Sequence, residues 1–213
     1  MKKKLIIVSA GGAGREVAQI VLDIQATNTV EWEFAGFLDP DPDYFIKTDY
    51  DLPLLGKVDD WQPGEYELYI SASGCPDYRE KSTLLLEERG AKFTNVIHPT
   101  VLISSNAKYE NGLVIYPFTC ITAHSYIGKH VMINLHNAIG HDTYIGDYSV
   151  LSSFCDITGH VKLGKKVFLG SHVTIAPELK IGDGANVGIG SVVVSSVKAG
   201  KRVFGNPAKA LKL

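Results

Sequence analysis

From residue 97 onward, an aliphatic side chain recurs at every sixth position of the chain. Of the seventeen positions in this series from Ile97 to Val193, sixteen hold Ile, Leu or Val, and the exception is Tyr109. Neither an α-helix, with a period of about 3.6, nor a β-strand, with a period of about 2, produces this spacing. The pattern predicts a parallel β-helix in which each hexad forms one short strand and one corner.

Other positions of the hexad also follow a rule when the aliphatic residue is counted as position one. Position five is small or branched, and position two is often glycine, which permits backbone angles that a side chain disfavours. We therefore expect these glycines to form the corners. Three hexads make one coil of about 18 residues, and a spacing of about 4.8 Å per coil gives a prism about 27 Å long. The glycines are Gly128, Gly140, Gly146, Gly164, Gly170, Gly182 and Gly188.

The first ninety residues follow a different pattern, in which short apolar runs alternate with amphipathic ones. Apolar runs at 4–9, 33–38 and 66–73 predict buried strands, and the patterns at 16–24 and 78–89 predict helices. Alternating strands and helices indicate a small parallel, Rossmann-like sheet. We expect two domains, an α/β domain over residues 1–92 and a β-helix over residues 93–213.

Three loops of the α/β domain carry candidate ligand-binding residues. Ligands of parallel sheets bind at the carboxyl ends of the strands, where all three loops fall. A glycine turn between a strand and a helix also offers free backbone N–H groups to a phosphate. The sequence thus predicts a nucleotide site made by Gly11, Gly12 and Ala13 after the first strand, by Asp39 and Pro40 after the second, and by Gly74 after the third.

Composition narrows the function further. A net charge of −2 and a pI near 6.4 disfavour nucleic acid as a partner. No apolar run reaches the roughly 18 residues of a membrane span, and the run at 5–8 after three lysines is too short for a signal peptide. Three cysteines that fit no disulfide or zinc pattern make a reducing cytoplasm the expected location.

The histidines are candidate general bases, and their phase in the hexads singles out one of them. His141 stands at position three, where stacking at about 18 residues places Ala123 and Gly159 beside it. Small neighbours leave its ring room to meet a substrate. A surface imidazole without a chemical role is the alternative. Five of the seven histidines stand at position four, and these are His124, His130, His136, His160 and His172.

The hexads resemble those of the hexapeptide-repeat acyltransferases, whose β-helices are left-handed and usually trimeric. The ending at residues 205–209, Gly-Asn-Pro-Ala-Lys, is similar to the Gly-x-Pro-Ala-Lys ending of many members. With the glycine turn at 11–15, the Phe-Leu-Asp end of the second strand at 37–39, and Gly74 followed by Arg79, the whole chain resembles the sialic-acid O-acetyltransferase family. That family includes enzymes of glycan biosynthesis that N-acetylate UDP- or GDP-linked 4-amino-dideoxy sugars.

The resemblance implies an N-acetyltransferase in which His141 is the general base and the acidic Asp142 follows it. A sugar amine must lose a proton before it attacks the thioester of acetyl-CoA, and an imidazole accepts that proton near neutral pH. Transfer is then direct, and a backbone N–H stabilises the oxyanion. Asp142 also falls in the 18-residue column of His124 and His160, so a structural role between them remains an alternative.

The resemblance also places acetyl-CoA, with no metal, between neighbouring β-helices of a homotrimer. It implies cofactor contacts at Val150, Ser171, Ala176 and Ile189, with Pro207 and Lys209 near the adenine end. Three positions depart from the family pattern. The family often has glycine where Ser9 stands, and histidine where Ala13 and Val150 stand.

Other functions remain open at this point. O-acetylation of a sugar or of sialic acid is the first alternative, and a non-catalytic protein that binds sugar nucleotides is another. A γ-carbonic-anhydrase-like zinc site would use His136 and His141, but the third histidine expected 36 residues before His136 is replaced by Thr100. The column of His124, Asp142 and His160 also offers metal-ligand types.

Overall fold

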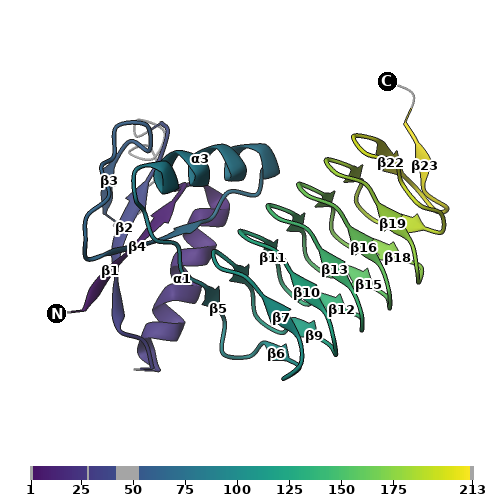
Figure 1. Cartoon of the computed structure of the whole chain (residues 1–213), viewed down its shortest axis with the longest axis horizontal. Coiled ribbons are helices and arrows are strands. Elements are labelled where there is room, and N and C mark those ends of the chain that lie inside the picture. The colour runs from purple at the N-terminus through teal and green to yellow at the C-terminus, as the bar shows by residue number, and fades with distance from the viewer. Residues whose placement is uncertain (1, 28, 42–52, 212–213) are drawn as a thin grey trace.

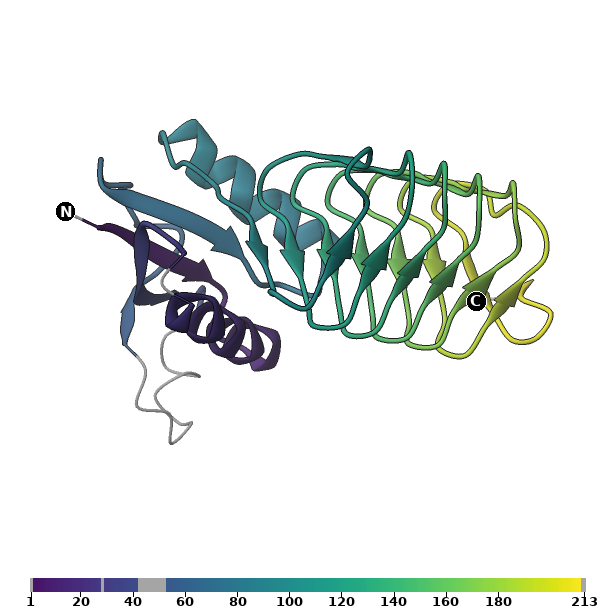
Figure 2. The same ribbon diagram turned by 90° about the horizontal axis from the view of Figure 1, so that it is seen from below.

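A computed structural model describes residues 2–27, 29–41 and 53–211 and shows an α/β unit at one end of a long β-helix (Figure 1). The later coils of the β-helix extend beyond the α/β unit, as the view from below shows (Figure 2). The predicted parallel β-helix is therefore confirmed, and it follows an N-terminal α/β unit as the strand and helix patterns indicated.

The α/β unit contains a four-stranded parallel sheet in the order β3-β2-β1-β4. The predicted strands and helices are present, with β3 as an additional edge strand. Helix α1 starts four residues earlier than expected, so the glycine turn itself forms the first turn of the helix. The elements are β1 (Lys3–Val8), α1 (Gly12–Ala26), β2 (Trp32–Leu38), β3 (Leu54–Gly56), β4 (Glu67–Ser71) and α3 (Pro76–Glu88).

The β-helix is a three-sided prism whose sides we call faces I, II and III. From β5 to β21, strands pair in parallel at a spacing of 18 residues, so the hexad count sets the register, and β20 pairs with β22 at a spacing of 16 residues. Face I holds β5 (Val96–Ile97), β8 (Val114–Ile115), β11 (Met132–Ile133), β14 (Val150–Leu151), β17 (Phe168–Leu169), β20 (Asn186–Val187), β22 (Arg202–Phe204) and the antiparallel β23 (Lys209–Ala210).

Faces II and III complete each coil. Face II holds β6 (Leu102–Ile103), β9 (Cys120–Ile121), β12 (Ala138–Ile139), β15 (Asp156–Ile157), β18 (Thr174–Ile175) and β21 (Val192–Val193). Face III holds β7 (Lys108–Tyr109), β10 (Tyr126–Ile127), β13 (Tyr144–Ile145), β16 (Lys162–Leu163) and β19 (Lys180–Ile181). The chain passes from face I to II to III, so the edge between faces II and III lies opposite face I.

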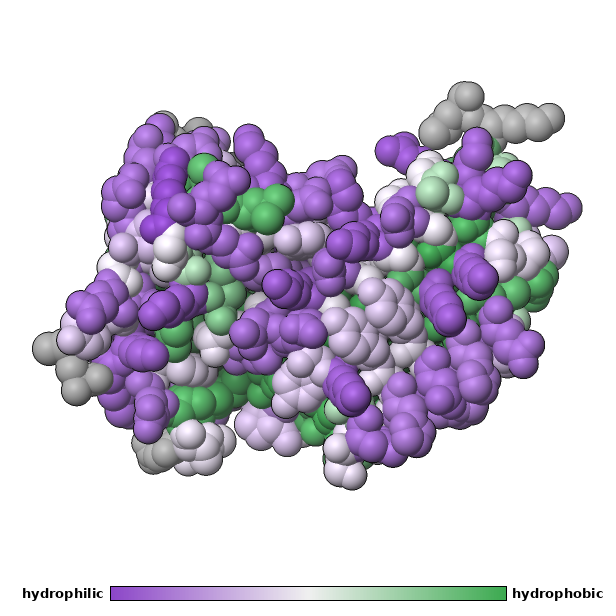
Figure 3. All heavy atoms as spheres, in the orientation of Figure 1, coloured by the Kyte–Doolittle hydropathy of each residue, from purple (hydrophilic) through white to green (hydrophobic). Residues whose placement is uncertain are grey.

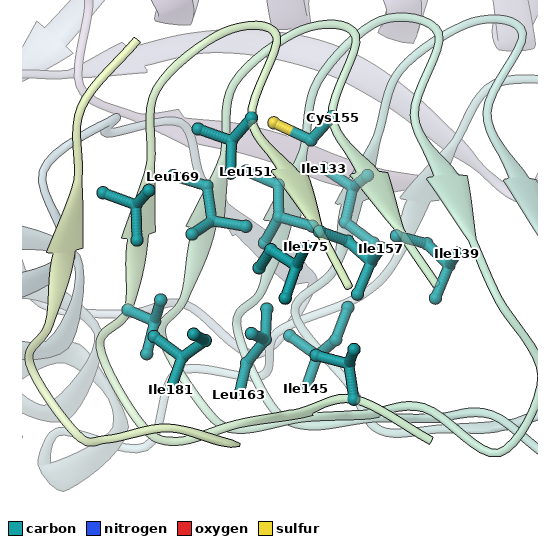
Figure 4. Close-up of a cluster of buried hydrophobic side chains, with 14 of the residues drawn as sticks. Ile133, Ile139, Ile145, Leu151, Cys155, Ile157, Leu163, Leu169, Ile175 and Ile181 are labelled. Carbon is teal, nitrogen blue, oxygen red and sulfur yellow. The ribbon is translucent and has the colours of Figure 1, made fainter. Parts of the chain in front are cut away.

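The aliphatic residues of position one fill the prism. From Ile115 to Val193 all of them are buried, and like residues of successive coils lie next to one another (Figure 4). Burial of one such side chain stabilises the fold by about 1.5–3 kcal/mol. Tyr109, the exception in the series, stands in the first coil and is 45% exposed, so it lies at the end of this core.

The corners are not formed as the sequence suggested. At every position four from Gly112 to Gly190 the backbone has a positive φ, and most of these residues are not glycine. The glycines of position two do not have a positive φ. A Cβ at Gly146 would instead lie 2.5 Å from the backbone carbon of Gly164 in the next coil. Position two is therefore glycine because successive coils approach closely there.

The left-handed conformation at position four costs about 1–2 kcal/mol for a residue with a side chain. On the corner between faces I and II, the rings of Phe118, His136, Phe154 and His172 form a stack with centroid separations of 4.9–5.0 Å. Such ring pairs contribute about 0.5–1.5 kcal/mol each and offset part of that cost.

Position four of the corner between faces III and I holds the α/β unit in place. His130 is buried, and its Nε2 lies 3.0 Å from Glu87 Oε1 of α3. The ammonium of Lys166 contacts Glu80 and Asp77 of the same helix at 2.8 and 3.3 Å. Helix α1 packs beside the outer side of face I, where Val150 joins a shared hydrophobic core. The α/β unit therefore covers part of face I.

The two roles of glycine predict different costs for substitution. Gly146→Ala should lower the free energy of unfolding by about 3 kcal/mol or more, because the added Cβ meets backbone atoms of the next coil. Gly190→Ala meets nothing within 4 Å and should cost only the backbone penalty of about 1 kcal/mol. Denaturant unfolding of both variants measures the difference. Equal losses, or the reverse order, would contradict this account of the corners.

Candidate functional site

The three predicted binding loops meet at one edge of the α/β sheet. The carboxyl end of β1 pairs with those of β2 and β4, since Val8 lies opposite Leu38 on one side and Ser71 on the other. Helix α1 begins at Gly12 without a side-chain cap on its backbone N–H groups. A Cβ at Gly12 would meet nothing within 4 Å. The edge is therefore an open cradle with free backbone donors, which suits a phosphate.

Asp39 supports this cradle through hydrogen bonds from the backbone of two loops. Its side chain is buried, Oδ2 accepts a hydrogen bond from the Ala10 backbone N–H at 2.6 Å, and Oδ1 accepts one from the Asp41 N–H at 2.9 Å. The carboxylate thus ties the second loop to the glycine turn. Pro40 and Gly74 stand exposed beside it.

Ser9, where the family often has glycine, adopts a φ of +88°. This conformation favours glycine, and it is required because the turn folds tightly onto the helix start. A Cβ at Gly14 would lie 2.1 Å from the Ser9 carbonyl oxygen. The turn therefore holds a serine in a backbone conformation that favours glycine.

His141 stands at the corner between faces II and III, just after β12. The side chain is 59% exposed, and its Nδ1 lies 2.8 Å from Asp142 Oδ2. A Cβ at Gly159 would lie 2.6 Å from His141 Nε2, so the ring lies over a residue without a side chain. The predicted small neighbour is thus confirmed at Gly159. One ring nitrogen contacts the Asp142 carboxylate, the other lies over Gly159, and the ring meets the His160 ring edge-to-face with centroids 5.1 Å apart.

Asp142 occupies position four, with His160 above it in the column at 3.9 Å from its Oδ2. The hydrogen bond from His141 holds the pKa of the Asp142 carboxyl below its usual value, and nearby His160 and His124 act in the same direction. Asp142 therefore stays ionised across the neutral range. The predicted column of His124, Asp142 and His160 is present, and Asp142 contacts His141 more closely than either of them.

The predicted cofactor residues fall into separate groups. Ser171 and the 63% exposed Ile189 follow β17 and β20 at the corner between faces I and II, and Ala176 follows β18 on the His141 side. Pro207 is exposed, and Lys209 lines an open cleft of about 400 Å³ with two further lysines, Lys198 and Lys201.

Val150, which was predicted to contact the cofactor, is buried in the single chain. Its side chain is only 4% exposed and packs in the core shared by face I and the α/β unit. The residue that precedes position one of a hexad points outward. At Val150, however, the α/β unit covers the outward side of β14. An apolar residue, rather than the family's histidine, suits this dry position.

One chain does not bring the cradle and His141 together. The α/β unit packs on face I, whereas His141 and Asp142 lie on the opposite edge of the prism. The zinc alternative draws its histidines from neighbouring subunits. Within one chain, His136 stands at the corner between faces I and II, stacked between Phe118 and Phe154, and His141 stands at the corner between faces II and III.

Three residues near the cradle were given no role from the sequence. Tyr116 of the second coil donates to the Ala13 carbonyl at 3.4 Å, and burial raises its pKa well above the usual value. Tyr78 stands near Asp39, and burial raises its pKa to about 12. Arg79 is fully buried, with a pKa lowered to about 9, and donates to the carbonyls of Ser73 and His130. Tyr116 and Arg79 make contacts between the α/β unit and the β-helix, which a one-dimensional pattern does not reveal.

A cleft continues from the cradle along the β-helix. It has a volume of about 390 Å³ and lies between the start of α3 and the uncovered part of face I. Gly74, Cys75 and Asp77 form one wall, and Phe168, Asn186 and Arg202 lie across from them. This polar cleft places room for a ligand next to the third loop of the cradle.

The fold and these groups define a β-helix protein with a nucleotide cradle at one end and a histidine–carboxylate pair on an exposed corner. No protein-family model matches the chain. Among solved structures, a variant of perosamine N-acetyltransferase from Caulobacter crescentus, with CoA and GDP-perosamine, has a TM-score of 0.88 and 24% identity, covering 99% of this chain and 97% of that one. The acetyltransferase domain of PglB from Neisseria gonorrhoeae, with acetyl coenzyme A, has a TM-score of 0.85 and 23% identity, covering 99% and 100%.

WeeI from Acinetobacter baumannii is similar over nearly the full length of both chains, with 30% identity, a TM-score of 0.85, and coverage of 97% of this chain and 99% of that one. The protein therefore belongs to the same family as WeeI, and it shares its fold with the two acetyltransferase structures. Across the described parts of the chain, no helix combines the length and apolar character needed to span a membrane.

Proposed function

We propose that the protein transfers the acetyl group of acetyl-CoA to the amine of a nucleotide-linked amino sugar, with His141 as general base. The observation that carries this proposal is the His141–Asp142 pair, whose Nδ1–Oδ2 distance is 2.8 Å beside a residue without a side chain. A similar protein has been solved with CoA and GDP-perosamine, which are substrates of the corresponding chemical classes.

The hydrogen bond to Asp142 selects the useful form of the imidazole. Because the ionised carboxylate accepts only, Nδ1 carries the proton and Nε2 keeps its lone pair. Nε2 lies over Gly159, which has no side chain to cover it, and the His141 side chain as a whole is 59% exposed. The Asp142 carboxylate also stabilises the imidazolium that forms when Nε2 takes up a proton.

In the proposed reaction, His141 acts first as a base and then as an acid. Nε2 accepts a proton from the sugar ammonium, and the free amine attacks the thioester carbonyl carbon. The nitrogen of the tetrahedral intermediate releases its second proton to water, and the intermediate collapses with cleavage of the C–S bond and formation of the neutral amide. The departing CoA thiolate is protonated from the imidazolium, which returns His141 to its neutral state.

The cradle is the proposed site for the nucleotide part of the substrate. Gly11, Gly12 and Ala13 present backbone N–H groups at the start of α1, and the macrodipole of this 15-residue helix favours a diphosphate there. Asp39, Pro40 and Gly74 complete the edge. The sugar extends into the adjoining cleft of about 390 Å³.

Because the cradle and His141 lie on opposite sides of one chain, the proposed active unit is a homotrimer in which neighbours complete each other's site. Large exposed hydrophobic residues are present at the corner between faces I and II, including Phe118 at 58%, Phe154 at 48% and Ile189 at 63%. By contrast, hydrophilic residues cover most of the side seen in Figure 3. The aromatic corner is therefore the better packing surface.

Acetyl-CoA would lie between neighbouring prisms, with Ser171 and Ile189 from one corner and Ala176 from another. The C-terminal end of the β-helix fits the negative charge of acetyl-CoA. Lys198, Lys201 and Lys209 line one cleft there, near Pro207, and can hold its phosphate groups.

The finer parts of the proposal are a left-handed prism, a Rossmann-like first domain over residues 1–92, a β-helix domain over 93–213, and a cytoplasmic location. The likeness in fold and three free cysteines support them.

Occupation of the cradle should affect one substrate only. Gly12→Leu adds a side chain where a Cβ meets nothing within 4 Å, so the fold should tolerate it. We expect the KM for the nucleotide sugar to rise about tenfold or more, with little change in the KM for acetyl-CoA. Gln19→Leu, on an exposed position of the same helix, is the matched control and should change neither value. An equal rise of both constants would show that the cradle does not bind the nucleotide.

Removal of the base should affect the chemical step. His141→Asn keeps a similar size and polarity, and kcat should fall about 10²–10⁴-fold with acetyl-CoA affinity nearly unchanged. The wild-type rate should rise with pH, since the neutral imidazole is the active form, and the residual rate of the variant should lose that dependence. His136→Asn, in the aromatic stack, should retain its rate. If His136→Asn is inactive and His141→Asn is not, the site lies at another corner.

A further inference from the structure

The corner that carries His141 also holds a second imidazole within reach of the same carboxylate. Ligand atoms of His141, Asp142 and His160 all lie within 4.8 Å of one another, in the part of the molecule that the structure describes. All three side chains are exposed, at 59%, 42% and 55%. Two imidazoles and one carboxylate form a donor set that Zn²⁺ prefers.

The distances between the donors suit a small tetrahedral ion. His141 Nδ1 lies 2.8 Å from Asp142 Oδ2, and His160 Nε2 lies 3.9 Å from the same oxygen. Tetrahedral zinc with bonds of about 2.0–2.1 Å separates its ligands by about 3.3 Å, which falls between these two values. Small side-chain rotations at an exposed corner bring the three donors to that spacing and leave the fourth position for water.

We propose that His141, Asp142 and His160 form an inhibitory zinc site that switches off the general base. The proposal rests on the proposed role of His141, and zinc takes no part in the acetyl transfer itself. Nothing in the catalytic scheme uses His160, so the site gives a function to a residue that the reaction leaves unassigned.

The inhibition follows from the two nitrogens of the His141 ring. In the active form Nδ1 carries the proton and donates it to Asp142, and Nε2 is the base. Zinc bound at Nδ1 takes the lone pair there, so the single proton of the neutral ring moves to Nε2. A protonated Nε2 cannot accept the proton of the substrate amine. Zinc also occupies the carboxylate that would stabilise the imidazolium.

His136 provides a matched control on the same β-helix. It also stands at position four and is exposed, but its ring lies between Phe118 and Phe154, with centroids at 5.0 and 4.9 Å. The neighbours of His136 in this stack are aromatic rings rather than a carboxylate, so His136 should not hold zinc. His136→Asn therefore removes a surface imidazole without touching the proposed site.

The test measures zinc binding directly, on the full chain and without substrates. Competition with a chromophoric zinc chelator near pH 7.5 should show one zinc per chain with micromolar affinity for the wild type. His160→Asn should weaken binding about tenfold or more, and His136→Asn should leave it unchanged. Acetyl transfer should fall in proportion to zinc occupancy, and EDTA should restore it.

Several results would overturn the proposal. Absence of saturable zinc binding in the micromolar range, or equal binding by His160→Asn and the wild type, excludes the site. If zinc binds but does not slow acetyl transfer, the proposed move of the His141 proton from Nδ1 to Nε2 is excluded. The proposed function fails separately, through an active His141→Asn variant in the absence of zinc, because the binding measurement does not depend on activity.

Discussion

Successive coils of the β-helix stack in register at 18 residues, and this constraint shapes nearly every other feature of the structure. At position two the coils come so close that a Cβ would meet the next backbone, as at Gly146 and Gly164. At position four the chain turns with a positive φ, and the side chain points into a column of equivalents. Each corner of the prism therefore carries a ladder of residues whose chemistry the sequence is free to choose.

The three ladders serve three purposes. Aromatic rings such as Phe118 and His136 stack on one corner, and this exposed surface suits contact with another copy of the chain. His130 and Lys166 hold helix α3 on the second corner. The third corner holds Asp142 between imidazoles, next to His141. A single backbone rule thus provides a candidate assembly surface, the contacts that hold the α/β unit, and a candidate catalytic pair.

Much of this architecture could be predicted from the sequence. A period of six has one physical explanation, and it fixes the register, the buried series from Ile115 to Val193, and the placement of Gly159 beside His141. The loops of the α/β unit were also predictable, because parallel strands bring their carboxyl ends to one edge.

Other features depend on contacts that a pattern does not contain. The sequence shows glycine at position two but does not show that its role is close approach rather than a turn. The burial of Val150 depends on where the first domain packs, and the role of Arg79 depends on carbonyls from two distant segments. Asp39 was expected to face a ligand, and its carboxylate instead ties the cradle together through Ala10.

The central claim is that each active site combines the cradle of one chain with the His141 corner of another. His141→Asn and Gly12→Leu chains can be co-expressed with different tags. Purification on both tags yields trimers of mixed composition, and light scattering verifies their size. A cyclic trimer of this kind holds one intact pairing among its three interfaces, so at low nucleotide-sugar concentration it should recover about one third of the wild-type rate. If the mixed trimers are no faster than the parent variants, the site lies within one chain and the account is wrong.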